Sequence, residues 1–375
     1  MKTAILLKTL SLSLFLFACK SSPELKDQYS SVELLMRDVV KMGIPGIAVC
    51  YGASASYRCY QDGYVDVESG LVAVEKSRFR IASITKTFTA ALIYKLAERG
   101  LIDVEGNFTD YVSSESVNHI PYINQVRIID LLEHTSGIYN FTNSDDFEKS
   151  LFGSSRSRNL NLSPDDLLTY ATQKHNEPSF LPGKGHEYSN TGYILLGLLI
   201  EEVTGLSYAQ ALDAYIFVPC GMTDTGLEGS PGYSPDLHSY TYANAWDRIV
   251  QRQFGIGNGI LDGRRQLNSS SLFNVSSGRQ SFNGWAWSAG AINSTATDLA
   301  QFLQCYLDGN YQTTSNLDEV SQYSTYGWRG LSTGIDALMM YDVKERNIYV
   351  VLINATNGVV DANDIYQKLR QLVIK

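Results

Sequence analysis

Ser83 and Lys86 are the residues whose types and spacing suggest chemistry most directly. A serine hydroxyl is a weak nucleophile, so it needs a nearby base and a site that stabilises the developing negative charge. A lysine amine acts as such a base when burial or nearby positive charge lowers its pKa toward neutrality. The competing interpretation is a surface Ser and Lys on an amphipathic helix, because a chain of this length contains about one or two Ser-x-x-Lys matches by chance.

A further proton-transfer group is predicted at Tyr188, followed by Ser189 and Asn190. A tyrosine whose phenol pKa is lowered by neighbouring lysines can accept the serine proton, and the amide of Asn190 can hold the substrate or the lysine. The same Tyr-x-Asn pattern occurs at Tyr122 and Tyr242. Tyr188 is favoured because a Pro-Gly turn precedes it and an apolar helical segment follows it.

The elements around these residues can position them. Apolar residues recur at helical spacing after Ser83 and end at Gly100, which predicts a helix with Ser83 at or near its N-terminus and Lys86 one turn further on the same face. Free backbone N–H groups at a helix start favour developing negative charge. The segment 191–204 is apolar nearly all round and predicts a buried core helix directly after Tyr188.

The two chain ends share one pattern, a β-hairpin with a helix beside it. Near the N-terminus, the predicted helix is 30–40 and the predicted strands are 45–51 and 57–67. Near the C-terminus, the predicted strands are 336–342 and 347–354 and the predicted helix is 361–373. The pattern predicts one antiparallel sheet built from about 29–95 and 290–375, with a mostly helical region inserted at about 96–289. Together these form one catalytic domain, 29–375.

The N-terminus predicts export. Two lysines precede a short apolar run, so residues 1–18 are typical of a signal peptide. Leu-Phe-Ala-Cys at 16–19 resembles a bacterial lipobox, which makes Cys19 a lipidated N-terminus and 19–28 a tether to a membrane facing the periplasm. The alternative is an ordinary signal peptide and a soluble periplasmic protein.

Composition excludes several classes of function. The net charge of −9 argues against a nucleic-acid partner. The cysteines lack the close pairs that bind zinc, so neither a metal site nor a cofactor is predicted. Cys50 and Cys59 face each other across a predicted hairpin and would form a cross-strand disulfide in an oxidising compartment. Two buried free thiols are the alternative.

Several segments, in order along the chain, resemble the serine β-lactamase-like hydrolases: class C β-lactamases, low-molecular-weight D,D-peptidases and family VIII carboxylesterases. The matching segments include PGIAV at 45–49, FRIASITKTF at 79–88, LLEHTSG at 131–137, YSNTGY at 188–193 and AGAINSTATDL at 289–299. The resemblance implies an α/β (α+β) fold of the β-lactamase/transpeptidase type. It also implies Ser83 as nucleophile, with Lys86 and Tyr188 handling its proton. Asn190 is implied as a support.

The third motif departs from the β-lactamase version. The family usually has Lys or His, any residue and Gly on a strand that lines the site, whereas this chain has Trp328 in the cationic place before Gly330. Trp carries no charge to hold a substrate carboxylate, and strand alternation should turn Arg329 to the opposite face. Trp-x-Gly is similar to family VIII carboxylesterases, while a packed core aromatic is the alternative for Trp328. The resemblance implies the backbone N–H groups of Ser83 and Leu331 as the oxyanion hole.

These features predict a serine hydrolase that acts through an acyl-enzyme on a small carboxylic ester. One alternative is a D,D-peptidase or weak β-lactamase acting on cell-wall peptides or β-lactams. An alternative of another class is a penicillin-recognising sensor or a binding protein without turnover. His134 is predicted to be structural, and the Gly- and Ser-rich segment 230–284 receives no role.

Overall fold

A computed structural model describes most of the 375-residue chain. The described residues are 24–54, 56–152, 162–172, 177–230, 238–242, 266–267, 272–274, 286–310, 325–332, 334–356 and 360–373. The predicted signal peptide at 1–18, Cys19 and most of 230–284 lie outside them.

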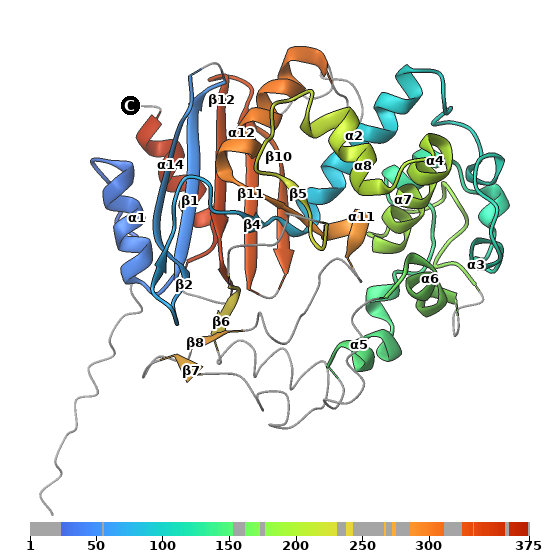
Figure 1. Ribbon diagram of the computed structural model, residues 1–375, viewed down its shortest axis with the longest axis horizontal. Coiled ribbons are helices and arrows are strands. Elements are labelled where there is room, and N and C mark those ends of the chain that lie inside the picture. Colours follow the sequence, from blue (N-terminus) through green and yellow to red (C-terminus); the bar gives the residue numbers. More distant parts are fainter. Residues whose placement is uncertain are drawn as a thin grey trace, which may run out of the picture.

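Strands from both chain ends form one antiparallel sheet of six strands (Figure 1). Its order is β10 (Thr325–Ser332), β11 (Ile335–Asp342), β12 (Asn347–Ile353), β1 (Gly46–Ala53), β2 (Arg58–Asp66) and β3 (Leu71–Val72). β1 pairs with β12, so the first hairpin lies directly beside the last one. The prediction of a sheet built from both ends is therefore confirmed.

The two faces of the sheet are covered by different helices. Successive β12 residues alternate between two apolar clusters, as a strand requires: Val350 packs in one and Val351 in the other. The cluster of Val351 includes the flanking helices α1 (Val32–Lys41) and α14 (Ala362–Val373), and the cluster of Val350 includes α12 (Ala296–Cys305) and α2 (Thr85–Glu98). α1 begins at Val32 and not at residue 30 as predicted, because Ser31 caps it with a side chain that accepts the Leu34 N–H.

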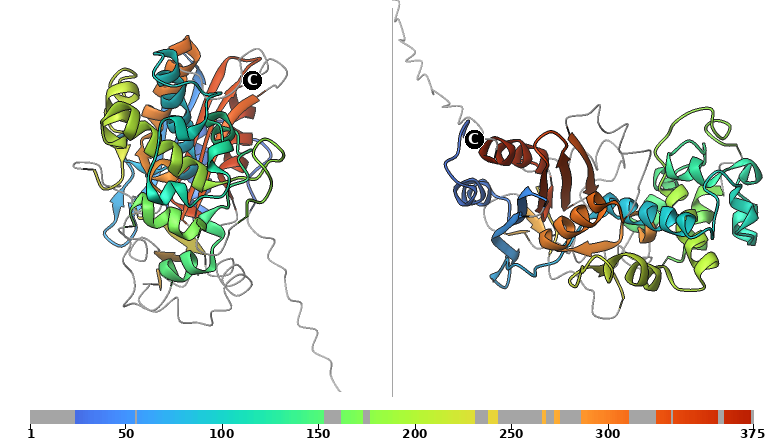
Figure 2. Two further views of the ribbon diagram at one scale, coloured as in Figure 1. Left: turned by 90° about the vertical axis from the view of Figure 1, so that its right-hand side faces the viewer. Right: turned by 90° about the horizontal axis from the view of Figure 1, so that it is seen from above.

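The inserted region is mostly helical and lies to one side of the sheet (Figure 2). Its helices are α3 (Glu115–Asn118), α4 (Ile128–Leu132), α5 (Asp145–Phe152), α6 (Pro164–Thr172), α7 (Asn190–Thr204) and α8 (Tyr208–Leu212). α7 packs against α2, α4, α6, α8 and α11 (Trp287–Gly290), which explains why its sequence is apolar on nearly every side. The predicted buried helix is thus confirmed.

A small sheet leads the chain into α2. It has the order β4 (Phe79–Arg80), β9 (Ile292–Ser294) and β5 (Gly226–Leu227). The Arg80 guanidinium donates to both carboxylate oxygens of Glu228 at 2.9 and 3.1 Å, and both side chains are nearly buried. This ion pair fixes β4 three residues before Ser83.

A second small sheet has the order β13 (Ala355–Thr356), β6 (Tyr240–Tyr242), β8 (Leu272–Asn274) and β7 (Gln266–Leu267). Its β6 strand runs parallel to β13, which follows β12 in the chain. The described parts of 230–284 therefore include a connection to the central sheet.

Two disulfides link segments of the described chain. Cys50 and Cys59 are paired residues of β1 and β2 and are bonded, as one of the two alternatives from the sequence had it. Cys220 is bonded to Cys305 at the end of α12, a pairing that the sequence analysis did not predict.

Among the described residues, no single helix is long and apolar enough to cross a bilayer. α7 and the following segment Tyr208–Phe217 meet the length and composition criteria only as a bent pair.

Candidate active site

Ser83 lies in a tight turn between β4 and α2. It is the middle residue of the 3₁₀ turn Ala82–Ile84, and α2 begins directly afterwards at Thr85. Ala82 has a φ of 44°, in the left-handed region that a non-glycine residue rarely adopts. Such strain is common where a functional side chain must be presented in one direction.

The strand β10 approaches this turn so closely that only glycine fits. A Cβ added to Gly330 would lie 1.9 Å from the Ile81 carbonyl oxygen and 3.1 Å from the backbone nitrogen of Ser83. The next residue, Leu331, lines a cavity together with Ser83. Gly330 therefore allows the backbone of β10 to run beside Ser83, as the predicted oxyanion hole requires.

Lys86 follows Ser83 by one turn and is only 6% exposed. Its Nζ donates to Asn190 Oδ1 and to the Ala289 carbonyl oxygen, both at 2.7 Å, and it lies 3.4 Å from Ser83 Oγ. Burial lowers the pKa of the amine to about 7. Near neutral pH a large fraction of Lys86 is therefore the neutral amine, which can act as a base. The surrounding hydrogen-bond acceptors hold the amine in place.

Tyr188 places its hydroxyl 2.8 Å from Ser83 Oγ. The residue is 42% exposed, but its phenol group is largely desolvated, and this raises the pKa of Tyr188. The hydrogen bond with Ser83 lowers the pKa by a smaller amount. The expectation that neighbouring lysines lower this pKa is wrong. Desolvation of the phenolate dominates here, and Trp328 adds no positive charge where the family usually has a cation.

Asn190 is held on three sides at the start of α7. Its Oδ1 accepts from Lys86, its Nδ2 donates to Thr142 Oγ1 at 3.2 Å, and its backbone N–H donates to Asn140 Oδ1 at 3.1 Å. The cap of α7 is the preceding Ser189. Asn190 thus orients the lysine, and the structure adds Thr142 and Asn140 to the site. No motif in the sequence indicated these two residues.

His134 supports Tyr188 from behind. Its Nδ1 accepts the backbone N–H of Ser189 at 3.2 Å, and its ring packs 4.5 Å from the Tyr188 ring, centre to centre. Burial, followed by the charges of Lys86 and His186, lowers the pKa of His134 to about 4. A neutral imidazole that accepts a backbone hydrogen bond agrees with a positioning role.

Trp328 lies on the side of β10 that faces Ser83. Its ring packs edge to face against Tyr326 at 4.8 Å and Tyr306 at 5.7 Å, and the residue lines a cavity that also contacts Ser83. The neighbouring Arg329 is bound by Asp336 at 2.8 Å and by Asp361 at 3.0 Å. The guanidinium is therefore engaged elsewhere, as strand alternation predicted.

Two cavities meet at Ser83 and Tyr188. We call the first the Leu331 cavity; it has a volume of about 240 Å³ and includes Asn190, Leu331 and Thr142 in its wall. We call the second the Trp328 cavity; it has a volume of about 340 Å³. Its wall consists of Ser83, Lys86, Thr87, Ala90, Leu132, His134, Tyr188, Tyr193, Gly327, Trp328 and Arg329.

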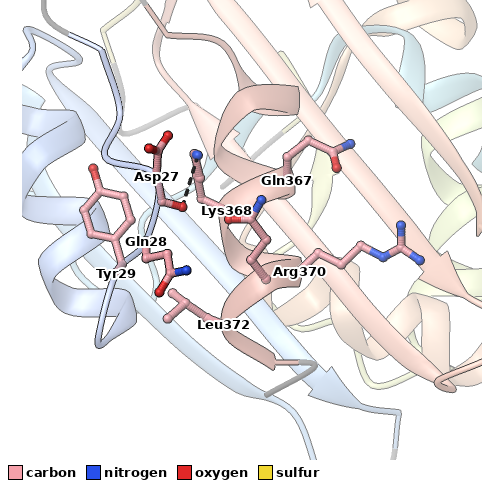
Figure 3. A pocket seen from close by; sticks show the side chains of 8 residues that line it. Asp27, Gln28, Tyr29, Gln367, Lys368, Arg370 and Leu372 are labelled. Carbon is pink, nitrogen blue, oxygen red and sulfur yellow. Dashed lines mark hydrogen bonds between the residues drawn. The ribbon is translucent and has the colours of Figure 1, made fainter.

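A larger hollow of about 480 Å³ lies between the segment at Asp27–Tyr29 and α14 (Figure 3). α14 and α2 cover opposite faces of the central sheet. Lys368 donates there to the Asp27 carbonyl oxygen at 3.4 Å. The residues of its wall include no serine, cysteine or histidine, so this hollow offers no counterpart of Ser83.

Asp66, Glu68 and His238 could together hold a cation, because their ligand atoms lie within 4.8 Å of one another. These groups already contact each other and the protein: His238 Nδ1 is 3.1 Å from Asp66 Oδ1, and Glu68 accepts the Tyr240 hydroxyl at 2.8 Å. Contacts among these groups and with Tyr240 therefore account for the cluster. The prediction that the protein uses no metal stays a prediction.

Comparison with known proteins places this geometry in context. The family model described as Beta-lactamase matches residues 32–325. Penicillin-binding protein 4* of Bacillus subtilis (strain 168) is 32% identical over 191 residues, which are 48% of this chain and 40% of the relative. Protein flp of Staphylococcus aureus (strain COL) is 30% identical over 196 residues, 52% of this chain and 37% of the relative. The chain thus spans about two fifths of the length of these curated relatives.

Solved structures share the fold over most of the chain. A D-stereospecific amidohydrolase from Streptomyces sp. has a TM-score of 0.68 at 22% identity and covers 90% of this chain and 96% of its own. The D-amino acid amidase from Ochrobactrum anthropi SV3, complexed with L-phenylalanine amide, has a TM-score of 0.70 at 19% identity and covers 91% of this chain and 97% of its own. The similarity establishes the β-lactamase/transpeptidase-like fold that the sequence predicted.

Proposed function

The chain belongs to the beta-lactamase family, whose members are serine hydrolases, and on that premise we propose that it cleaves small carboxylic esters through an acyl-enzyme on Ser83. One observation carries the proposal. Ser83 Oγ lies 2.8 Å from the Tyr188 hydroxyl and 3.4 Å from Lys86 Nζ, and burial lowers the pKa of Lys86 to about 7. A nucleophile with two proton-transfer partners is what acyl transfer requires.

The proposed reaction uses these groups in turn. Ser83 Oγ attacks the ester carbonyl carbon while its proton passes to the neutral Lys86 amine, directly or through the Tyr188 hydroxyl. The raised pKa of Tyr188 keeps the phenol protonated, so that it relays a proton and does not act as a stored phenolate. The backbone N–H groups of Ser83 and Leu331 stabilise the oxyanion.

Collapse of the tetrahedral intermediate breaks the bond to the alcohol oxygen, which takes the proton back from the same pair. A water molecule then attacks the acyl-enzyme, and the same groups move its proton to Ser83 Oγ as the carboxylic acid leaves. In this second half-reaction the pair again accepts a proton first, now from water, and then donates it, now to Ser83 Oγ.

The preference for a neutral substrate rests on β10. Trp328 stands where the family usually has Lys or His, and the guanidinium of Arg329 is engaged by two aspartates. A substrate carboxylate that bound at this position would lose its hydration and gain no positively charged partner, which is energetically unfavourable. An ester with an apolar portion carries no such cost.

Hydrolysis of amino acid amides is the second candidate. The observation that favours it is the shared fold with the D-stereospecific amidohydrolase and the D-amino acid amidase over nine tenths of this chain. An amino acid amide also has no free carboxylate, so Trp328 is compatible with it.

The test compares the protein with its Ser83→Ala variant on 4-nitrophenyl acetate, D-phenylalanine amide, a fluorescent penicillin and a fluorophosphonate. We expect ester turnover and fluorophosphonate labelling that depend on Ser83, with little labelling by penicillin. Stable penicillin labelling without turnover would support a penicillin-recognising sensor. Rapid penicillin hydrolysis would support a β-lactamase, and no labelling of Ser83 by any probe would refute a serine hydrolase.

We also propose that Cys19 is lipidated and anchors the protein to a membrane facing the periplasm. The lipobox-like sequence at 16–19 supports this proposal. Metabolic labelling with a fatty acid analogue should mark the protein and not its Cys19→Ser variant, whereas equal labelling of both would contradict the anchor.

A further inference from the structure

Two successive carbonyl groups of α11 accept hydrogen bonds from residues one turn apart on α2. Lys86 Nζ donates to the Ala289 carbonyl oxygen, and Thr89 Oγ1 donates to the Ser288 carbonyl oxygen, both at 2.7 Å. The peptide group between Ser288 and Ala289 is also bound on its other side, because the Ala289 N–H donates to the Ala286 carbonyl oxygen at 2.6 Å. Thr89 therefore fixes the peptide group directly before the carbonyl that holds Lys86.

Tyr208 extends this arrangement by one more hydrogen bond. Its hydroxyl lies 2.7 Å from Thr89 Oγ1, and both side chains are fully buried. The single hydroxyl hydrogen of Thr89 points to the Ser288 carbonyl, because its other acceptor, the Thr85 carbonyl, is further away at 3.3 Å. The Tyr208 hydroxyl must then be the donor to Thr89. The result is a chain of hydrogen bonds from Tyr208 through Thr89 to Ser288, in which each bond strengthens the next.

The segment that carries these carbonyls is packed tightly between α2 and α7. Ser288 Oγ donates to the Tyr193 carbonyl oxygen of α7 at 2.8 Å. A Cβ added to Gly197 of α7 would lie 2.7 Å from Ser288 Cβ and equally close to the Trp287 ring. Trp287 has a φ of 30°, and its ring packs edge to face against Tyr208 at 5.3 Å. Such a strained backbone persists only where the surrounding contacts hold it in place.

The hydrogen bonds of Lys86 show why the position of the Ala289 carbonyl matters. A neutral amine has two N–H groups and one lone pair. Asn190 Oδ1 and the Ala289 carbonyl oxygen, each at 2.7 Å, accept the two N–H groups. The lone pair is then left for the Ser83 hydroxyl, whose oxygen lies 3.4 Å away. Displacement of the Ala289 carbonyl would free one N–H group and release the amine from this orientation.

We propose that Thr89 and Tyr208 are positioning residues for Lys86, because their hydrogen-bond chain holds the Ala289 carbonyl where it orients the amine toward Ser83. The proposal rests on the proposed function, in which Lys86 takes the Ser83 proton. The described walls of the two cavities at Ser83 include neither Thr89 nor Tyr208. Both residues therefore act through α11 and not through contact with a substrate.

The test removes the two hydroxyl groups separately. Thr89→Val keeps the shape of the side chain and leaves the Ser288 carbonyl and the Tyr208 hydroxyl without their partner. Tyr208→Phe removes only the donor behind Thr89. We expect kcat for 4-nitrophenyl acetate to fall by about tenfold in Thr89→Val and by about threefold in Tyr208→Phe, with KM changed by less than about twofold. Thr89→Ser restores the hydroxyl and should recover kcat.

NMR of the protein with ¹³C-labelled lysine gives a readout that needs no turnover, with the Lys86 signal assigned from Lys86→Met. The Ala289 carbonyl binds the charged amine more strongly than the neutral one, so its displacement lowers the pKa of Lys86. We expect Thr89→Val to lower this pKa by about half a unit to one unit. The titratable groups around the amine, Tyr188, Tyr193 and His134, are the same in this variant.

Two controls carry the same substitutions elsewhere in the molecule. Thr172→Val removes a hydroxyl that donates to the Leu168 carbonyl oxygen at 3.1 Å within α6. Tyr240→Phe removes the hydroxyl of a fully buried tyrosine, which donates to Glu68 at 2.8 Å. Both should leave kcat and the Lys86 pKa unchanged. Melting curves of each variant verify that it is folded.

The outcomes distinguish this proposal from the proposed function. A folded Thr89→Val with the kcat and the Lys86 pKa of the original protein overturns the positioning role and leaves ester hydrolysis standing. Absence of Ser83-dependent ester turnover overturns the proposed function, while the Lys86 pKa still shows whether Thr89 positions the amine. If Thr89→Val does not fold, Tyr208→Phe decides by the same two readouts. A lower kcat and pKa that Thr89→Ser recovers support the proposal.

Discussion

In the proposed mechanism, the burial of Lys86 sets the pH range in which Ser83 acts as a nucleophile. Burial lowers the pKa of the amine from 10.5 to about 7, so the basic form predominates above neutral pH. We predict that kcat/KM for ester hydrolysis falls below about pH 7 with a slope of one proton. A pH profile with 4-nitrophenyl acetate measures this, and a flat profile between pH 6 and 9 would contradict the assignment of Lys86 as base.

The same pKa links Lys86 to the stability of the fold. The lysine binds a proton in the unfolded chain below about pH 10, but in the folded chain only below about pH 7. Between these pH values the unfolded state therefore holds more protons than the folded state. The contribution of Lys86 to the free energy of unfolding consequently rises with pH across this window. Below about pH 7 this contribution is fully lost.

Lys86→Met removes this linkage. We predict that its free energy of unfolding, relative to that of the original protein, is highest near pH 7 and declines toward pH 10, while esterase activity is lost at both values. Urea unfolding at both pH values measures the difference. A difference that does not change with pH would show that Lys86 titrates normally.

At the scale of single elements, the proposed substrate preference depends on β10. Trp328→Lys places an ammonium where the family usually has a cation, while Trp328→Phe keeps the position aromatic and uncharged. We predict that Trp328→Lys raises the rate of labelling by penicillin, a carboxylate, by about tenfold or more and lowers ester turnover. Equal labelling of the two variants would mean that charge at this position does not control substrate choice.

The sequence predicted those elements whose pattern is local. The hairpins at the chain ends and the buried α7 follow from alternation and apolar periodicity. The β4–β9–β5 sheet could not be predicted in this way, because two of its strands have only two residues and their partners lie far away in the chain. Short strands carry too little pattern of their own.

Only part of the candidate site could be predicted, because only some of its residues are close together in the sequence. Ser83 and Lys86 are one helical turn apart, so their proximity follows from the helix. Tyr188 lies 105 residues after Ser83, and it was favoured among three Tyr-x-Asn matches by the segments around it and by the family resemblance. Thr142 joins the site through one hydrogen bond to Asn190, and no spacing rule indicates such a contact. The sign of the Tyr188 pKa shift depends on burial, which the sequence did not reveal.

At the scale of the whole molecule, the two disulfides differ in the length of chain that they close. Cys220 and Cys305 are separated by 85 residues, and Cys50 and Cys59 by 9. The chain-entropy estimate is about 4 to 5 kcal/mol for the long loop and about 2 to 3 kcal/mol for the short one. We predict that the Cys220→Ser, Cys305→Ser double variant loses more stability than the Cys50→Ser, Cys59→Ser control.

Urea unfolding of the oxidised proteins measures both losses. An equal or larger loss in the Cys50 and Cys59 control would contradict a dominant role of loop length. Dithiothreitol should bring the unmodified protein to a stability below that of either double variant, because it opens both disulfides.

In the proposed mechanism, Ser83 carries the acyl group during turnover. Mass spectrometry of the protein quenched during hydrolysis of 4-nitrophenyl acetate tests it most directly. We predict one added acetyl group, located by proteolysis on the peptide that contains Ser83 and absent from Ser83→Ala. Turnover that continues in Ser83→Ala, or an acetyl group on another residue of the original protein, would contradict the account.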